Sequence, residues 1–282
     1  PMTLAAIRPT EIAPAVLDAA PFIHRVGHLD VRLAASDAEI AAAQALRYQI
    51  FYDEMGARPT PAMAAQRRDM DDYDALCDHL LVIDHEVAGR PQVVGTYRLL
   101  RQDVALAHRG FYSAGEYDLA PLIAGSGPGR QLLELGRSCV APAFRTNTTI
   151  TLLWRGIAAY LQQHGISHLF GCASLHGADP LLHQAELSYL YHHHLAPPEL
   201  RATALPDCRV EMNWRDPATI DARAAARALP PLLKGYLRVG AMVGDGGFLD
   251  RQFNTVDVFV VMPVDRITSR YASRFGAAND AG

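Results

Sequence analysis

The chain has 282 residues, of which 50% are hydrophobic and 20% charged, the balance of a globular protein with a substantial core. Its formal net charge of -4 excludes the overall basic field expected of a nucleic-acid-binding protein, and we predict no nucleic-acid partner. Four cysteines without a C-x-x-C pair, and no apolar run of the roughly 18 residues that span a membrane, predict a cytoplasmic protein with free thiols.

The ordered part of the chain is predicted to begin near residue 28. Residues 1–27 have no strong periodicity and are interpreted as an N-terminal arm. Residues 28–33 alternate apolar and polar side chains, which predicts a strand. Ser36, followed three residues later by Glu39, predicts a capping box at the start of a helix that Gly56 and Pro59 end. This helix has its apolar residues on one face: Ile40, Ala43, Leu46, Ile50 and Phe51.

Strands and helices alternate through the rest of the chain. Residues 80–84 and 92–101 predict two antiparallel strands joined by a turn. The elements expected next are a short helix at 119–123, a strand at 131–140, a helix at 148–164 and a strand at 168–172. Beyond residue 175 we expect helices at 180–194, 219–229, 232–237 and 266–275, and strands at 209–214 and 253–264. This order predicts an α/β (α+β) fold with helices packed on the faces of one mixed sheet.

Charged and aromatic side chains stand out in four of these segments. They are Arg47 and Phe51 on the first helix, Asp69, Asp71 and Asp74 in the loop after it, Arg98 on strand 92–101, and Glu134 and Arg137 on strand 131–140. Together they resemble the acyl-homoserine-lactone synthases, which have an Arg and a Phe four apart, an acidic triplet, an Arg-Leu strand and a Glu-x-x-Arg strand. The chain departs from that family at Met55-Gly56-Ala57, where a tryptophan is usual, and at Asp69, where the family has a glutamate.

Longer runs give a closer match. Residues 134–140, 232–238, 244–246 and 250–257 resemble the ornithine N-acyltransferases of bacterial lipid synthesis, and this resemblance extends over residues 29–270. It implies one GNAT-like domain, a mixed central sheet flanked by helices, with a core at 28–175, an α+β C-terminal extension at 176–270 that lines an acyl tunnel, and a tail at 271–282. It also implies transfer of a 3-hydroxyacyl group from acyl carrier protein to the α-amine of L-ornithine, which gives lyso-ornithine lipid. No bound cofactor is expected, because the donor is the acyl-phosphopantetheine of the carrier protein.

Aminolysis of a thioester needs a base, fixed donors for the oxyanion and a bound amine. We predict Glu134 as the base, directly or through a water, with binding of the substrate ammonium as the alternative. On a regular strand Glu134 and Arg137 would face opposite sides. We therefore expect a β-bulge at Gly136, which would bring both side chains to one side. It would also free backbone N–H groups within Gly136–Cys139, including that of Ser138, for the oxyanion.

The amino acid itself presents a carboxylate and a second amine. Arg98 and Arg137 are expected to grip the carboxylate, since guanidinium groups bind carboxylates in a bidentate fork. Asp71 and Asp74 are expected to supply negative charge for the second amine. The resemblance adds Arg47, Phe51 and Asp69 to the substrate site. Two structural alternatives stay open, in which Arg47 and Arg98 are ion-pair partners of the loop acids and Glu134 forms a buried pair with Arg137.

The identity of the acyl donor is predicted from the absence of a glycine-rich pyrophosphate loop. GNAT pyrophosphate loops are rich in glycine, because glycine lets the backbone approach phosphate closely, but residues 145–149 contain none. This favours a carrier-protein donor over coenzyme A. Arg145 and Arg155 are predicted to contact the acidic carrier protein.

Three other patterns are given structural interpretations. His192, His193 and His194 would diverge by about 100° each on a helix, so we predict no metal site there. Cys172, near two histidines, is interpreted as a buried thiol rather than a nucleophile. Residues 244–247, which are rich in glycine, are interpreted as a turn beside the acyl pocket.

Several functional alternatives stay open. Within enzymes they are a homoserine-lactone synthase and an N-acyltransferase for another amino acid. Outside enzymes the alternative is a non-catalytic lipid- or membrane-binding module. A lipid product also leaves peripheral contact with the inner membrane open, although the arm has few basic residues.

Overall fold

The computed structural model describes residues 23–86, 89–127 and 129–267. The strands are β1 (His24–Val26), β2 (Leu29–Leu33), β3 (Asp78–Asp84), β4 (Gln92–Arg101), β5 (Tyr117–Asp118), β6 (Gln131–Val140), β7 (Ile166–His176), β8 (Thr203–Ala204), β9 (Arg209–Val210), β10 (Met242–Asp250) and β11 (Thr255–Pro263). The helices are α1 (Asp37–Tyr48), α2 (Pro61–Gln66), α3 (Gln102–Ala107), α4 (Ala120–Gly125), α5 (Asn147–His164), α6 (Gln184–His194), α7 (Ala222–Ala228) and α8 (Pro231–Arg238). A π-helical segment, η1 (Gln49–Glu54), extends α1, and a 3-10 turn, η2 (Tyr112–Gly115), precedes β5.

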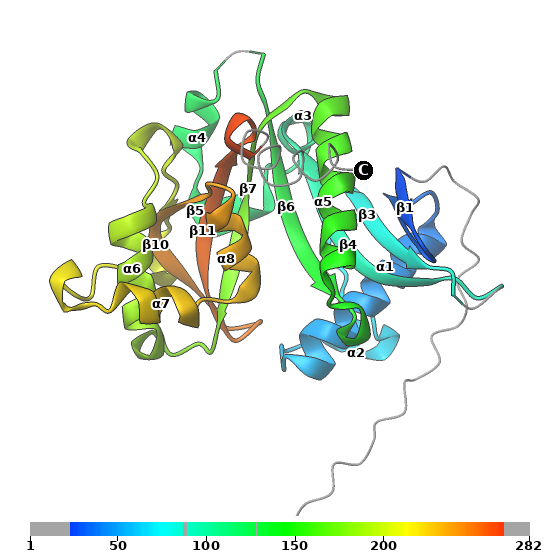
Figure 1. Cartoon of the computed structure of the whole chain (residues 1–282), viewed down its shortest axis with the longest axis horizontal. Helices are drawn as coiled ribbons and strands as arrows, with labels where there is room; N and C mark the ends of the chain where they lie inside the picture. Colours follow the sequence, from blue (N-terminus) through cyan, green and yellow to red (C-terminus); the bar gives the residue numbers. More distant parts are fainter. Residues whose placement is uncertain (1–22, 87–88, 128, 268–282) are drawn as a thin grey trace, which may run out of the picture.

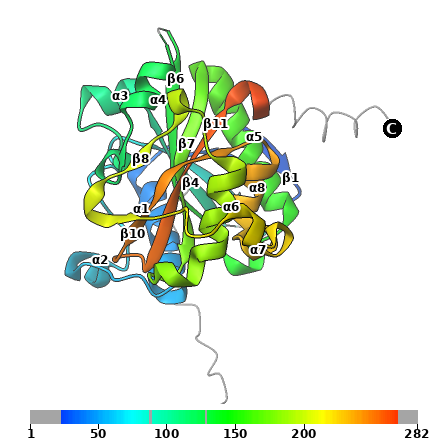
Figure 2. The ribbon, with the colours of Figure 1, turned by 90° about the vertical axis from the view of Figure 1, so that its left-hand side faces the viewer.

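The described strands form one mixed sheet in the order β1-β2-β3-β4-β6-β7-β11-β10-β8-β5, with β9 also paired to β10 (Figure 1). Neighbours from β1 to β6 are antiparallel, β6 and β7 are parallel, and β7, β11 and β10 are again antiparallel. Figure 2 shows α6, α7 and α8 on one side of the strands and α2, α3 and α4 on the other. The predicted mixed central sheet flanked by helices is thereby confirmed.

The two faces of the sheet differ in chemistry. Leu100, Leu132, Phe170 and Phe259 belong to one apolar cluster under α4 and β5. Side chains two residues apart on a strand share a face. The polar neighbours of these residues therefore lie on the same face, further along each strand: Arg98 on β4, Glu134 on β6, Cys172 on β7 and Asp257 on β11. We call this the site face; the opposite face packs against α5, α6 and α8 in the larger core.

The ladder between β6 and β7 stops halfway along both strands. It runs from Gln131↔Ile166 to Glu134↔Phe170, although β6 continues to Val140 and β7 to His176. Beyond this point β6 pairs only with β4 and β7 only with β11, and Figure 1 shows the two halves of the sheet diverging. Gly171 stands at the branch, where an added Cβ would lie 2.2 Å from the carbonyl oxygen of Leu135. The sheet therefore splits directly after Glu134.

Most predicted elements match the structure. The strands at 92–101 and 131–140 have the predicted bounds. Strand β3 begins two residues and helix α5 one residue before the predicted start. Ser36 caps α1 as predicted, since its side chain accepts from the N–H of Glu39. The Glu39 carboxylate accepts from the N–H of Ala35 and pairs with Arg32. The segment predicted as an arm ends in β1, while residues 1–22, the predicted tail at 271–282 and most of the predicted helix 266–275 lie outside the described ranges.

Two predictions in the C-terminal part are wrong. Residues 244–247 lie within strand β10 and are not a turn. Their glycines permit close packing, because a Cβ on Gly244 would come within 2.6 Å of the carbonyl oxygen of Ala202. The strand predicted at 209–214 is limited to Arg209–Val210, since the backbone beyond it turns around the Ser188 hydroxyl, which bonds Met212 and Trp214.

Two helical glycines give a matched pair of predictions. In α5 a Cβ on Gly156 would lie 2.8 Å from methyl groups of both Leu80 and Val31, whereas around Gly235 in α8 there is nothing within 4 Å. Alanine favours a helix over glycine by about 1 kcal/mol, but overpacking a core costs about 1–3 kcal/mol. We expect Gly156→Ala to lower and Gly235→Ala to raise the free energy of unfolding, measured by denaturant titration. Two shifts of the same sign would contradict this account.

Candidate active site

Six charged side chains form a closed cluster on the site face. We call it the arginine–aspartate network: Arg47 from α1, Arg98 from β4, Arg137 from β6, and Asp69, Asp71 and Asp74 from the loop before β3. Each arginine pairs with two of the aspartates and each aspartate with two of the arginines. The network is thus electrically balanced within itself, and it joins the loop to both strands.

Arg47 is the most deeply buried member. Its side chain is 0% exposed and donates to Asp69 Oδ2 at 2.8 Å and to Asp74 Oδ2 at 2.9 Å. Burial by itself would raise the pKa of Asp74, but the Arg47 and Arg98 guanidinium groups outweigh it and hold this pKa well below its ordinary value. Asp69 is held below its ordinary pKa in the same way, chiefly by Arg137 and Arg47 against burial. Arg47 and Arg98 thus form ion pairs with the loop aspartates, as one of the two interpretations of the sequence expected.

Arg137 reaches the network through a β-bulge. Thr96 pairs with Cys139 and Arg98 with Gly136, so Arg137 and Ser138 together face one residue of β4. Arg137 has a φ of 49°, in the left-handed region that side chains seldom adopt. The predicted bulge is present, one residue beyond Gly136. It brings Arg137 to the side of Arg98, as the alternation argument required.

The Arg137 guanidinium forms the outer edge of the network. It lies between two aromatic rings, 5.0 Å from the centroid of Tyr112 and 4.9 Å from that of Phe253. Its side chain is 12% exposed, and that of its partner Asp71 is 22% exposed. Of the six members these two are the most exposed, so they are the ones within reach of a bound molecule. Phe51 lies nearby, edge-on to Phe253 with ring centroids 5.8 Å apart.

Glu134 has a different partner from the one expected. Its carboxylate forms no ion pair with Arg137 among the described interactions. Instead it accepts hydrogen bonds from the N–H of Tyr112 (2.8 Å), the N–H of Ser113 (2.8 Å) and the hydroxyl of Ser113 (2.5 Å). Burial raises its pKa, against the effect of these donors. Glu134 therefore holds η2 over the point where the sheet splits, and the alternative of a buried Glu134–Arg137 pair is wrong.

The two arginines predicted to meet a carrier protein lie away from this cluster. Arg145 precedes α5 and Arg155 lies within it, and both are exposed. Arg145 makes a bidentate pair with Glu54 at 2.7 and 2.8 Å, and Arg155 contacts His24. At the start of α5 the Thr146 side chain accepts from the N–H of Thr149.

A group of residues beside Glu134 was not predicted from the sequence. They are Tyr112, Ser113, Glu116, Asp250 and Asp257, of which the last two fall in the run 250–257 that carried the resemblance. Asp257 could have been noticed as a lone carboxylate in the middle of an apolar strand. Glu116 and Ser113 lie in a turn without a pattern, and no sequence signal distinguishes them.

The histidines and cysteines take structural positions. His192 and His194 bond to different partners, the carbonyl of Arg215 and the hydroxyl of Tyr189. All four cysteines are free, as predicted. Burial raises the pKa of the Cys172 thiol well above its ordinary value, so the thiolate that a nucleophile requires is disfavoured.

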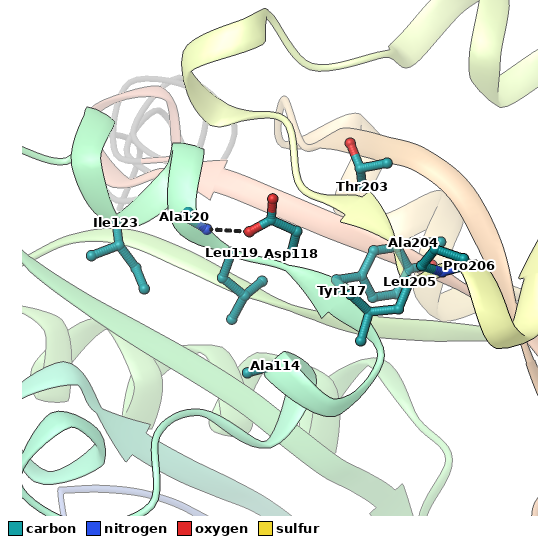
Figure 3. Close-up of a pocket in the computed structure, with 10 residues that line it drawn as sticks. All are labelled: Ala114, Tyr117, Asp118, Leu119, Ala120, Ile123, Thr203, Ala204, Leu205 and Pro206. Atoms are coloured by element: carbon teal, nitrogen blue, oxygen red, sulfur yellow. Dashed lines mark hydrogen bonds between the residues drawn. The ribbon is translucent and has the colours of Figure 1, made fainter.

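A shallow pocket of about 650 Å³ lies at the edge of the site face (Figure 3). Ala114, Leu119 and Ile123 line one side of it, and Ala204 and Leu205 line the other. Ala114 follows Ser113, which bonds Glu134, but Glu134 is not among the lining residues. Residues 203–206, in the segment predicted as a C-terminal extension, thus contribute to an apolar surface next to the site, although this pocket does not end at Glu134. No helix in the described ranges is both long and apolar enough to span a bilayer.

The chain is similar to known proteins in sequence and in fold. A model of the acetyltransferase (GNAT) domain matches residues 46–155. A protein of Agrobacterium fabrum (strain C58) named L-ornithine N(alpha)-acyltransferase is 48% identical over 254 residues, 89% of this chain and 86% of its own. One of the same name from Brucella abortus (strain 2308) is 49% identical over 255 residues, 90% of each chain. Among solved structures, FeeM, an N-acyl amino acid synthase from uncultured soil microbes, shares the fold with a TM-score of 0.50 at 11% identity, covering 86% of this chain and 94% of that one.

Proposed function

The chain belongs to the L-ornithine N(alpha)-acyltransferases, and from this premise we propose that it transfers a fatty acyl group from acyl carrier protein to the α-amine of L-ornithine. The product is N-acylornithine, the lyso form of ornithine lipid. In this reaction the α-ammonium gives one proton to the base, the free amine attacks the thioester carbonyl, and the C–S bond breaks. Of the two protons that the nitrogen loses in all, one ends on the leaving thiolate and the other is released to solvent.

The observation that carries the proposal is the split of the sheet directly after Glu134. Beyond it, residues 135–140 of β6 and 171–176 of β7 have no ladder to each other. Open strand edges bind extended, amide-bearing chains through their backbone groups. A phosphopantetheine arm is such a chain, and it would bring the thioester to the site face beside Glu134 and the bulge.

The proposed roles follow from this placement. Glu134 takes the proton from the α-ammonium, and because burial raises its pKa it is a stronger base than an ordinary glutamate. Backbone N–H groups at the bulge of Arg137 and Ser138 are the proposed donors to the oxyanion. Arg137, at the exposed edge of the network, is the proposed partner of the ornithine carboxylate. Arg137 is positioned by its ion pair with the buried Asp69, which Arg47 also binds. Arg98 and Asp74 complete the buried part of the network.

A carrier-protein donor is supported by the start of α5. It has no glycine and is capped by its own Thr146, so it offers less room for a pyrophosphate than a glycine-rich loop. Two exposed arginines lie here, Arg145 before α5, where it pairs with Glu54, and Arg155 within the helix. Both features fit an acidic protein whose single phosphate stays further from the backbone.

The test is a product assay with the purified chain. We expect mass spectrometry to find N-acylornithine formed from 3-hydroxyacyl carrier protein and ornithine, with kcat/KM at least about tenfold higher than with the same acyl group on coenzyme A. Glycine, homoserine and S-adenosylmethionine serve as competing acceptors. An acyl-homoserine lactone or another N-acyl amino acid as the main product would contradict the proposed acceptor, and equal use of coenzyme A would contradict the proposed donor.

A further inference from the structure

A second group of carboxylates lies next to Glu134 and is used by none of the roles above. We call it the acidic triad: Glu116 at the end of η2, Asp250 at the end of β10 and Asp257 on β11. One carboxylate oxygen from each lies within 4.8 Å of one from each of the others. Residues from three separate segments thus direct negative charge at one point.

The triad lacks a positive partner within the described residues. None of the ion pairs in these ranges includes one of its members, in contrast to the arginine–aspartate network, where every acid is paired. Glu116 is 7% exposed, and its only side-chain hydrogen bond is a weak one at 3.3 Å from the Cys172 thiol to Oε2. Its Oε1 accepts no hydrogen bond from the described residues, yet it is not one of their fully enclosed, unpaired atoms. This oxygen of a largely buried carboxylate is therefore open to a bound group, and a cation there would offset the cost of burying the charge.

The cost of burying these carboxylates appears in the raised pKa values of Glu116 and Asp257. Burial, followed by repulsion from Asp257, raises the pKa of Glu116 to about 8. Burial likewise raises the pKa of Asp257 to about 6, although Thr255 donates a hydrogen bond to it. Asp250 Oδ1 accepts from the N–H groups of Gln252 and Phe253, whereas the Glu116 side chain receives only the weak thiol bond. No arginine in the described ranges pairs with the triad, in contrast to Asp74, which pairs with two. The triad thus has the features of a site for a cation.

We propose that the acidic triad binds the side-chain ammonium of the diamino acid substrate and so directs acylation to its α-amine. This inference rests on the proposed function and extends it to the choice of substrate. An ammonium group donates three hydrogen bonds, one for each carboxylate. The bound δ-amine stays protonated among three acids, which removes its nucleophilic lone pair and leaves the α-amine as the reacting group.

The triad lies at a suitable distance from the reaction centre. The Ser113 hydroxyl bonds Glu134 at 2.5 Å and lies 3.7 Å from Cys172 Sγ, which in turn bonds Glu116. One serine and one thiol therefore separate the proposed base from the triad. Bond lengths put the two nitrogens of extended ornithine about 6 Å apart. A single ornithine can then present one amine to Glu134 and the other to the triad.

The experiment compares ornithine with norvaline, which has the same carbon chain without the δ-amine. For the unmodified enzyme we expect kcat/KM to be at least about 100-fold higher for ornithine, because norvaline leaves buried acids unpaired. In Asp257→Asn and Glu116→Gln we expect kcat/KM for ornithine to fall about 10- to 100-fold while that for norvaline changes less than about threefold. Asp207→Asn, which removes an exposed carboxylate from the same part of the chain, is the matched control and should change neither.

Each outcome separates this inference from the function on which it rests. If no N-acylornithine forms at all, the proposed function and this inference both fail. If norvaline is acylated as efficiently as ornithine, the inference alone fails, and this comparison needs no variant. Equal losses for both acceptors in the triad variants would show that the triad serves the α-amine or the fold. Loss of ornithine selectivity on addition of a chelator would assign the triad to a metal ion.

Discussion

Glu134→Gln is expected to lower kcat for acyl transfer to ornithine by about 100- to 10,000-fold, the usual range for loss of a general base. The amide has nearly the same shape as the carboxylate but does not take up the ammonium proton. The substrate contacts proposed for Arg137 and the acidic triad do not involve Glu134, so KM for ornithine should change less than about threefold. Steady-state kinetics with acyl carrier protein as donor measure both constants.

The pH dependence distinguishes a base from a residue that only holds η2. Burial raises the pKa of Glu134, so its basic form is lost as pH falls through that raised value, and activity of the unmodified enzyme should fall with it. The variant lacks this group and depends on amine that is already deprotonated. Its rate should increase about tenfold per pH unit up to the pKa of the amine. Parallel pH profiles for both proteins would refute the assignment of Glu134 as base.

Ser113→Ala provides the matched control. It removes the hydroxyl that bonds Glu134 but leaves the N–H donors of Ser113 and Tyr112 in place. If Glu134 acts chemically, this variant should keep a pH profile of the original shape with a loss of about tenfold, since a hydrogen bond to a charged group contributes about 1.5–3 kcal/mol and the two N–H donors remain. A loss equal to that of Glu134→Gln would assign Glu134 the role of anchoring η2.

The elements that sequence reasoning located best are those whose local and tertiary preferences agree. Strands β4 and β6 have flanking turns and apolar faces, and the structure reproduces their predicted bounds. Strand β10 was missed because Gly244 and its neighbours carry a turn signal, while the reason for the glycines is contact with Ala202 and Val256 on adjacent segments. Such contacts are formed only in the folded sheet, and a local pattern does not reveal them.

The same distinction applies to the site. The bulge could be predicted because strand alternation conflicts with placing Glu134 and Arg137 on one side. The partner of Glu134 could not, since it is a backbone turn about twenty residues earlier with no motif of its own. The loop acids were expected to meet the substrate, but three arginines from three elements converge on them. The number of charges that meet at one point depends on the tertiary fold.

Arg47→Met should have the largest effect on stability. The variant keeps a long apolar side chain but leaves Asp69 and Asp74 without the guanidinium that pairs with both. Breaking a fully buried ion pair from one side costs about 3–5 kcal/mol, because the remaining charge stays buried without a partner. For a chain of this size we expect the Tm to fall by about 10 °C, measured by calorimetry. Arg145→Met is the matched control, since the Arg145–Glu54 pair is exposed and should contribute less than about 1 kcal/mol.

The acid limb of the stability curve tests the same interaction independently. The pKa values of Asp69 and Asp74 are lower in the folded protein than their ordinary value of 3.8. The stability they contribute is therefore fully present above about pH 4 and is lost as pH falls towards their folded pKa values. In Arg47→Met these acids lose one of the partners that depress their pKa, so the variant should lose less stability than the parent as pH falls below about 4. If both proteins lost stability equally over this range, the network would not be the source of the acid sensitivity, and its arginines would serve the fold only through packing.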